Sequence, residues 1–353
     1  MSTIKDRTWL RVSEGGAQEC WSQTCAGVGV VAWAALAVLA RIGLAPIGAI
    51  ELIFSFAPLV IAPLGMELAR VMAGTGSSDL VAQRFQPLGA GLAVVALWLP
   101  PGPFAGVLAS GWMTVCGLMG VSGVIDLVAA TQEKILGHEI PTSGNTGQKW
   151  GTRFSGDSRL SMGGIALVIP KIDLAVGGAW FVASRLGLRP MGIQEPIGLL
   201  TAVHFHFAGF ATALIAAATL HFARRSVADR WLPWVVLAVV GMPYVVAIGF
   251  VFSSELKMVA GVAFSFSVAA LALFVRSSGK TTRDSTARVL LQVAPASVFA
   301  GMVLSAAYAI ADFRGSDVLP IPQMARTHGV LNAVGFCMLG LLGWLIEFNS
   351  RTE

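Results

Sequence analysis

Long apolar segments of about 20 residues recur along the chain and are separated by short polar stretches. A segment of that length matches the hydrocarbon thickness of a bilayer when it is helical. The composition agrees, because 55% of the 353 residues are hydrophobic and only 12% are charged, whereas a soluble domain carries about 25% charged residues. The 40 glycines favour close packing of membrane helices. The sequence therefore predicts an all-α, polytopic transmembrane bundle.

We expect a single transmembrane domain over 1–353 with about ten spans. Residues 1–24 form a polar tail before the first span. The tail is too long to be the charged end of a cleavable signal, so the first apolar segment is interpreted as a retained helix. The third segment is short and is followed by a Pro-Gly-Pro turn, which predicts a hairpin. The predicted spans are 25–44, 48–69, 87–100, 104–130, 162–183, 198–222, 231–252, 258–275, 290–311 and 328–346.

The basic residues orient these spans. With ten spans and the N-terminus inside, 17 Lys and Arg residues fall on the inner side and 6 on the outer side, and Lys171 remains within a span. This asymmetry follows the positive-inside rule. Both termini and the 131–161 loop are therefore predicted to be cytoplasmic.

The positive charge does not indicate nucleic acid as a partner. The net charge is +5, but the basic residues are scattered among short loops and do not gather on one face. The four cysteines lack metal-ligand spacing and no disulfide framework is implied. We expect the lipid bilayer as the environment, and neither a cofactor nor a bound metal is predicted.

Polar residues within the spans are expensive in lipid, so each is a candidate for function. The orientation places those of the second, sixth and tenth spans in the outer half of the membrane. Other polar residues fall at about the same level. The resulting candidates are Glu51, His204, His206, His328, Asn332, Glu195, Tyr308 and Asp312.

Each candidate also has a structural interpretation. Glu51 could form an ion pair with Arg41 at the interface. His204 and His206 diverge by about 200° on a regular helix, so one of them is expected to be a packing residue. His328 and Asn332 are four residues apart and share one face, as a hydrogen-bonded pair would.

Further charges lie deeper or nearer the inner side. Pro170 predicts a kink beside Lys171 and Asp173, which either neutralise each other or form a functional site. Glu67 with Arg70, and separately Asp126, are expected to form ion pairs near the inner interface.

Three strings resemble the YndJ-like bacterial membrane proteins. They are IELIFSFAPLVIAPLGMEL (50–68), TAVHFHFAGF (201–210) and ARTHGVLNAVGF (325–336). The resemblance extends over most of the spans and implies a multi-pass protein of the bacterial cell membrane. The motifs of this family map here to His204, His206, His328 and Asn332, and Glu51 lies in the first string. By type alone, the chain is also similar to bacterial membrane-bound terpene cyclases of secondary metabolism.

The first functional hypothesis is an intramembrane enzyme that cyclises a lipophilic isoprenoid or meroterpenoid. Such a reaction needs a shielded acid to protonate an epoxide or alkene, and a carboxyl in a low-dielectric site keeps its proton until it is used. Glu51 is the candidate acid, with Glu195 or Asp312 as a further candidate, and a histidine is the candidate base. Aromatic faces would stabilise carbocations. The candidate wall residues are Phe205, Phe207, Phe210, Trp98, Trp112 and Tyr308.

Two alternatives stay open. A small-molecule or proton-coupled transporter would use Lys171 and Asp173 beside the Pro170 kink as a midplane site. A membrane metalloenzyme would use His204, His206, His328 and Glu51 as ligands, types that suit zinc or iron.

Overall fold

The computed structural model describes residues 7–136, 162–223, 228–316 and 319–351. These residues form a helical bundle, and no strand occurs among them. Ten of the described helices or helical runs are long and apolar enough to cross a membrane. They are Trp21–Arg41, Ala49–Ala73, Ser77–Trp98, Pro103–Gln132, Gly163–Leu186, Ile197–Phe222, Leu232–Phe252, Ser254–Gly279, Ser285–Phe313 and Ile321–Asn349. The predicted class of fold and number of spans are confirmed.

Several spans are built from more than one helical element. The α-helices are α1 (Arg7–Arg41), α2 (Ala49–Phe56), α3 (Ala62–Ala73), α4 (Ser77–Trp98), α5 (Pro103–Leu136), α6 (Met162–Leu186), α7 (Ile197–His204), α8 (Ala213–Phe222), α9 (Leu232–Phe252), α10 (Ser254–Gly279), α11 (Ser285–Phe313), α12 (Ile321–Met324) and α13 (Leu339–Asn349). The π-helical segments are η1 (Ala57–Ile61), η4 (Phe205–Thr212), η6 (Ala325–Gly329) and η7 (Leu331–Met338), and the 3₁₀ turns are η3 (Pro190–Gly192) and η5 (Ala228–Trp231).

The third span begins ten residues before the predicted boundary at 87, because α4 runs through Pro87 and starts at Ser77. The buried polar residues Asp79, Gln83 and Gln86 form one face of its first half. Because these residues are polar, a search for apolar segments does not include the first half of α4. The first helix also begins earlier than predicted, because α1 starts at Arg7, which lies within the predicted tail. Most of the predicted 131–161 loop lies outside the described residues.

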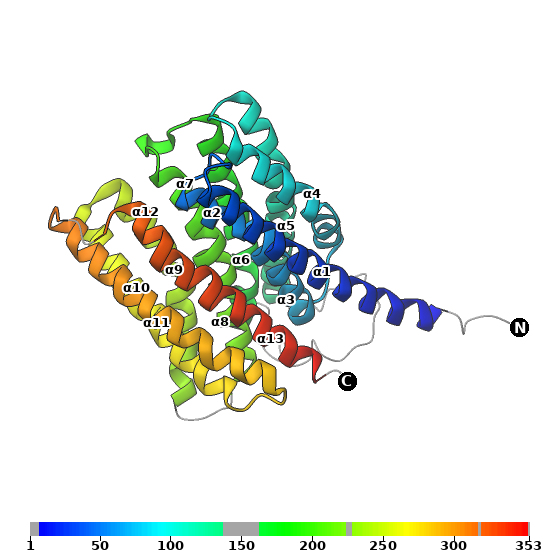
Figure 1. Cartoon of the computed structure of the whole chain (residues 1–353). Coiled ribbons are helices and arrows are strands. Elements are labelled where there is room, and N and C mark those ends of the chain that lie inside the picture. Colours follow the sequence, from blue (N-terminus) through cyan, green and yellow to red (C-terminus); the bar gives the residue numbers. More distant parts are fainter. Residues whose placement is uncertain (1–6, 137–161, 224–227, 317–318, 352–353) are drawn as a thin grey trace, which may run out of the picture.

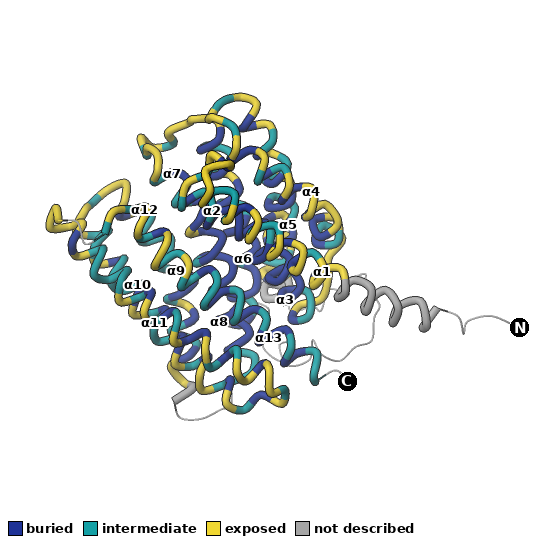
Figure 2. The backbone as a smooth tube through the Cα atoms, viewed as in Figure 1, coloured by how far each residue is buried: buried dark blue, intermediate teal, exposed yellow. Residues whose placement is uncertain are grey.

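The helices pack around α6, which contacts α5, α7, α8 and α9 as well as η4. Two hairpin groups flank this centre. The α4 and α5 helices form one, while α9, α10 and α11 form the other (Figure 1). Burial is greatest along the second and sixth spans, is lower in α6, and is lowest in the outer helices (Figure 2). The core is thus at the centre of the bundle, and the apolar side chains of the peripheral helices face outward, as lipid requires.

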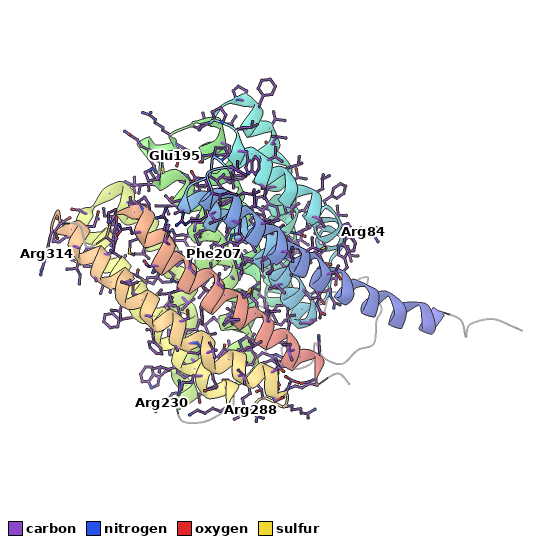
Figure 3. The ribbon with its side chains drawn as sticks, in the orientation of Figure 1. Arg84, Glu195, Phe207, Arg230, Arg288 and Arg314 are labelled. Carbon is purple, nitrogen blue, oxygen red and sulfur yellow. The ribbon has the colours of Figure 1, made fainter. Side chains whose placement is uncertain are left out.

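Charged side chains mark the two ends of the bundle. Glu195 and Arg314 lie at one end, and Arg230 and Arg288 lie at the opposite end (Figure 3). We call the end with Glu195 the outer end, following the predicted orientation. The α1 helix enters the bundle and α13 leaves it toward the same side (Figure 1), as an even number of spans requires.

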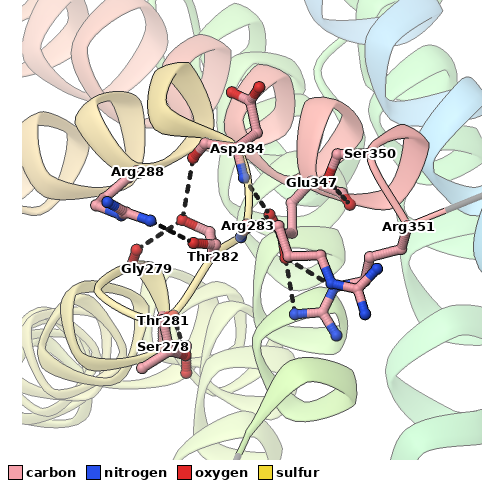
Figure 4. Close-up of polar contacts among 10 residues, drawn as sticks. All are labelled: Ser278, Gly279, Thr281, Thr282, Arg283, Asp284, Arg288, Glu347, Ser350 and Arg351. Carbon is pink, nitrogen blue, oxygen red and sulfur yellow. Dashed lines mark hydrogen bonds and ion pairs between the residues drawn. The ribbon is translucent and has the colours of Figure 1, made fainter. Parts of the chain in front are cut away.

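At the inner end, the buried carboxylate of Glu347 holds the loop between α10 and α11. Its Oε2 accepts hydrogen bonds from the backbone N–H groups of Arg283 (2.8 Å) and Asp284 (3.3 Å). Its Oε1 accepts one from Arg351 Nε (2.7 Å) (Figure 4). The Arg351 guanidinium also lies 4.6 Å from the ring centroid of Phe222. One carboxylate therefore joins the end of α13 to the α10–α11 loop and, through Arg351, to α8.

We expect Glu347→Gln to lower the free energy of unfolding by about 2–3 kcal/mol, because a charged acceptor of three hydrogen bonds becomes a neutral one. Thermal unfolding of the purified protein measures the change. The matched control is Glu255→Gln, since Glu255 is exposed at the start of α10. An equal shift for both variants would contradict the anchoring role of Glu347.

Candidate functional site

Three π-helical segments meet at the centre of the bundle. They are η1 in the second span, η4 in the sixth and η7 in the tenth, and each packs against the other two. A π-helical turn is a rare distortion that is frequent at functional sites. All three segments overlap the strings at 50–68, 201–210 and 325–336. The residues that the sequence singles out therefore come from helices that are both adjacent and locally irregular.

The irregular turns leave backbone carbonyls without their usual donors, and neighbouring side chains supply them. Pro63 has no N–H to offer the preceding turn, and Gln86 Nε2 of α4 donates to the Pro58 carbonyl at 2.6 Å. Thr212 Oγ1 donates to the Phe207 carbonyl at 2.9 Å. Ser297 Oγ of α11 donates to the Leu331 carbonyl at 2.9 Å. In lipid these donors are necessary, since water cannot replace them.

His206 is held in one tautomer inside the core. Its Nε2 accepts a hydrogen bond from Trp112 Nε1 at 2.9 Å, and an indole nitrogen can only donate. The proton of the neutral ring is therefore on Nδ1, which donates to the Ala202 carbonyl at 2.7 Å. Phe54 packs edge-on against the ring at 5.2 Å between centroids. With both nitrogens engaged and 1% of the residue exposed, His206 is the packing histidine of the pair.

His204 lies on the opposite face of the helix and is exposed, although it is within a span. Its Nδ1 donates to the Leu200 carbonyl at 2.7 Å. His328 is half-buried, and its Nδ1 donates to the Gly301 carbonyl of α11 at 2.8 Å. Neither His204 nor His328 is a hydrogen-bond partner of His206 among the described residues.

The predicted contact between His328 and Asn332 is confirmed. Asn332 Nδ2 donates to the His328 carbonyl at 2.7 Å. It also lies 3.2 Å from His328 Nδ1, but that nitrogen already carries the hydrogen directed at Gly301. Gly301 provides the space, because a Cβ there would come within 2.7 Å of Asn332 Nδ2. The Asn332 amide therefore fixes the turn that carries His328.

The predicted acids lie at the outer end and serve local structure. Glu51 Oε2 accepts from the Gly48 N–H at 3.1 Å and so caps α2, and the described residues show no ion pair with Arg41. Glu195 Oε2 accepts from the Leu199 N–H at 3.2 Å at the start of α7. Asp312 pairs with Lys257 at 2.7 Å, and both side chains are partly exposed. None of these three carboxyls is enclosed by the predicted aromatic residues.

The aromatic candidates divide by position. Phe205, Phe207, Phe210 and Trp112 are buried in the core, and Phe207 lies near the middle of the bundle (Figure 3). Trp98 is 40% exposed at the outer end of α4, where an indole suits the membrane interface. Tyr308 is half-buried on α11.

Lys171 and Asp173 do not neutralise each other, so this interpretation of the sequence is wrong. They are two residues apart on α6 and point to different neighbours. Lys171 Nζ lies 3.1 Å from Asp79 Oδ2, 3.0 Å from Asp126 Oδ2 and 2.9 Å from Ser122 Oγ. This cluster ties α6 to α4 and α5. The expected pair of Glu67 and Arg70 is confirmed, with 2.9 Å between Arg70 Nε and Glu67 Oε2.

Asp173 faces the opposite way, toward η4 and α9. Tyr244 of α9 donates a hydrogen bond to its Oδ1. The residue is 0% exposed, and its Oδ2 has no hydrogen-bond partner in the described part of the chain. Gly209 of η4 packs directly on the carboxyl, since a Cβ there would lie 3.0 Å from Oδ2. Asp173 is therefore a buried acid that forms no ion pair with any of the described residues.

Four residues of these clusters escaped the sequence analysis. Asp79 and Gln86 were missed because the third span was started at Pro87. Tyr244 was missed because a phenol carries no charge. Arg185 was assigned to an outer loop but is buried at the end of α6. The spacing of Asp79, Gln83 and Gln86 at i, i+4 and i+7 is the signal that could have shown a polar face.

No group of three or more His, Cys, Asp or Glu side chains suited to a metal ion occurs among the described residues. His206, one of the four proposed ligands, has both ring nitrogens engaged. The metalloenzyme hypothesis therefore gains no geometric support from the described part of the chain.

The fold and these intramembrane polar residues define a polytopic α-helical membrane protein with an internal, irregular polar core. Residues 52–336 match the family model of the YndJ-like proteins, and the chain belongs to this family. It is 31% identical over 177 residues to the uncharacterized membrane protein YndJ of Bacillus subtilis (strain 168). That alignment covers 50% of this chain and 32% of the relative. No solved structure matches the chain.

We expect Trp112→Phe to destabilise the protein by about 1–3 kcal/mol, because it leaves the buried Nε2 of His206 without a donor. Thermal unfolding is the measurement. Trp98→Phe is the matched control, as Trp98 is partly exposed at the outer end. If Trp98→Phe had the larger effect, the Trp112 hydrogen bond would not be what holds His206.

Lys171→Met is expected to cost about 3–5 kcal/mol, because it leaves Asp79 buried beside Asp126 without its cation. Lys257→Met removes an ion pair whose side chains are partly exposed, and we expect it to cost at most about 1 kcal/mol. Unfolding of both variants in the same detergent compares them. Equal stability would argue against a buried role for the Lys171 cluster.

Proposed function

We propose that the chain is a proton-coupled membrane carrier in which Asp173 binds the proton. The observation that supports this proposal is the burial of Asp173 without an ion pair to any of the described residues. Asp173 lies ten residues beyond Gly163, where the fifth span begins, which is about 15 Å along the helix and near the midplane. An ionised carboxylate there would be strongly unfavourable, and a proton removes that cost.

The surroundings of Asp173 favour a proton over a larger ligand. Tyr244 O–H donates to Oδ1, and Gly209 packs against Oδ2. A proton needs no additional space, whereas a metal ion or solute would have to displace η4. Because η4 is π-helical, a change in its winding offers a way to couple protonation to movement of the sixth span.

The packing of the two halves of the sixth span supports alternating access. Its outer part, α7, packs chiefly on α2 and α6, and His204 there is exposed. Its inner part, α8, contacts α3, α9, α10 and α13. The Lys171 cluster further ties the inner half of α6 to α4 and α5. Both halves pack on α6, but the inner half of the sixth span has more packing partners than the outer half, as a carrier that is closed on its inner side would have.

The cyclase remains a second candidate, and one contact favours it. The ring of Phe205 lies edge-on to that of Tyr244, with 5.9 Å between centroids, so aromatic faces adjoin the buried acid. An isoprenoid cyclase of secondary metabolism would then use Asp173 as the acid. Glu51 suits that role less, because it is partly exposed and caps its own helix.

We expect Asp173→Asn to abolish proton flux and Tyr244→Phe to reduce it by about tenfold, because the phenol orients the carboxyl. Liposomes containing the protein and a lumenal pH dye are given a proton gradient and a panel of amino acids, sugars and isoprenoid alcohols. Asp312→Asn is the control, since Asp312 lies in a partly exposed ion pair at the outer end.

Flux in the Asp173→Asn protein equal to that of the wild type would remove Asp173 from the mechanism. Wild-type flux no greater than that of empty liposomes with every solute would refute the carrier. The second candidate is tested by incubating membranes with farnesylated and epoxidised substrates. A cyclised product that disappears with Asp173→Asn would favour the enzyme instead.

A further inference from the structure

The turn between α10 and α11 carries a dense group of basic side chains. Residues 276–288 contain four cations and a single acid, Asp284. The acid is used locally, because its Oδ1 accepts from the Ala287 N–H at 2.8 Å and caps α11. None of the four cations forms an ion pair with a carboxylate in the described part of the chain. All four are exposed, and they are Arg276, Lys280, Arg283 and Arg288.

Hydrogen bonds fix the backbone of this turn. The hydroxyls of Thr281 and Thr282 each donate to a carbonyl of the same turn at 2.9 Å. The buried Glu347 carboxylate accepts from the Arg283 N–H at 2.8 Å. Arg288 reaches back from the first turn of α11, and its Nη2 donates to the Thr282 carbonyl at 2.7 Å (Figure 4). That bond uses one of the five N–H groups of the guanidinium. The cations are therefore grouped on a fixed backbone before any ligand binds.

Exposed apolar side chains lie directly beside these cations on the same two helices. Leu273 is exposed one turn before Arg276, on the same side of α10. On α11, Val289 and Val293 are exposed just beyond Arg288. In a membrane-spanning bundle such side chains face the acyl chains of lipids. Positive charge thus gives way to a lipid-facing surface within about one helical turn.

The neighbouring helix α9 shows that this end of the bundle lies at a membrane interface. Trp231 and Trp234 are both exposed at its start, and indole side chains favour the level of the lipid headgroups. The guanidinium of Arg230 lies 5.4 Å from the ring centroid of Trp231. Arg230 and Arg288 lie at the same end of the bundle (Figure 3). The basic turn is therefore at the depth where lipid phosphates are found.

We propose that the α10–α11 turn binds the headgroup of an anionic phospholipid. The four cations surround its phosphate, and its acyl chains lie along the exposed apolar sides of α10 and α11. A zwitterionic headgroup fits less well, because its ammonium would meet four positive charges. A soluble anion would leave the adjoining apolar surface unused. The inference is independent of the proposed carrier, since Asp173 lies on α6 and lipid binding is measured without proton flux.

Native mass spectrometry of the full-length protein in detergent tests the proposal, with phosphatidylglycerol and phosphatidylcholine of equal acyl chains as probes. We expect the wild type to bind phosphatidylglycerol at least about tenfold more tightly. Each basic residue at a membrane surface contributes about fivefold in affinity for anionic lipid. The double variant Lys280→Gln with Arg283→Gln should therefore weaken phosphatidylglycerol by about 25-fold and leave phosphatidylcholine unchanged. The single variant Arg276→Gln should weaken it by about fivefold.

The matched control is Arg189→Gln with Arg314→Gln, which removes two exposed cations assigned to the opposite end and should leave binding unchanged. Glycerol 3-phosphate, which carries the anion but no acyl chains, should not displace the lipid at equal concentration. Equal binding of the two lipids by the wild type overturns the proposal. So does an equal loss in the turn and control double variants, or an unchanged affinity in both turn variants. Displacement by glycerol 3-phosphate assigns a soluble anion to the turn and overturns the lipid.

Discussion

The absence of water inside a bilayer controls this structure, because every backbone N–H and C=O group must find a partner within the protein. Regular helices meet this demand alone, but three central spans contain π-helical turns that break the pattern, and the second of the ten spans also contains Pro58 and Pro63. Side chains from neighbouring helices complete it, as Gln86 does for the Pro58 carbonyl and Ser297 for the Leu331 carbonyl. Gly29 of α1 approaches the adjacent Leu59 carbonyl so closely that a Cβ would lie 1.9 Å from its oxygen. The irregular core therefore depends on its neighbours.

The same constraint separates the ionisable residues into those that stabilise the bundle and those available for function. His206 and Glu347 have hydrogen-bond partners in the core. These hydrogen bonds offset the free-energy cost of burying the two polar side chains. Asp173 and Arg185 are also buried but keep an unmatched polar atom. Natural proteins rarely leave such groups without a reason. The proposed proton site comes from this distinction between satisfied and unsatisfied groups.

From the sequence, the second, sixth and tenth spans could be predicted to carry polar residues at a similar depth, but their packing against one another and the role of each residue could not. Helical periodicity separated His204 from His206, and the structure agrees because the two rings lie on opposite faces of the helix. The same reasoning could not show that Lys171 reaches Asp79 and Asp126, since α4, α5 and α6 meet only after folding. Glu51 was selected for its charge within a span, whereas the fold uses it to cap α2.

Hydropathy and charge are properties of the chain, so they are enough to predict a lipid environment, ten spans and the helices that carry polar residues. Which polar groups have hydrogen-bond partners and which do not follows from the fold. That outcome depends on distances of about 3 Å between side chains far apart in sequence. Arg185 illustrates the difference. Its charge is visible just beyond a predicted span, but the burial of its Nε without a partner among the described residues is known only from the folded bundle.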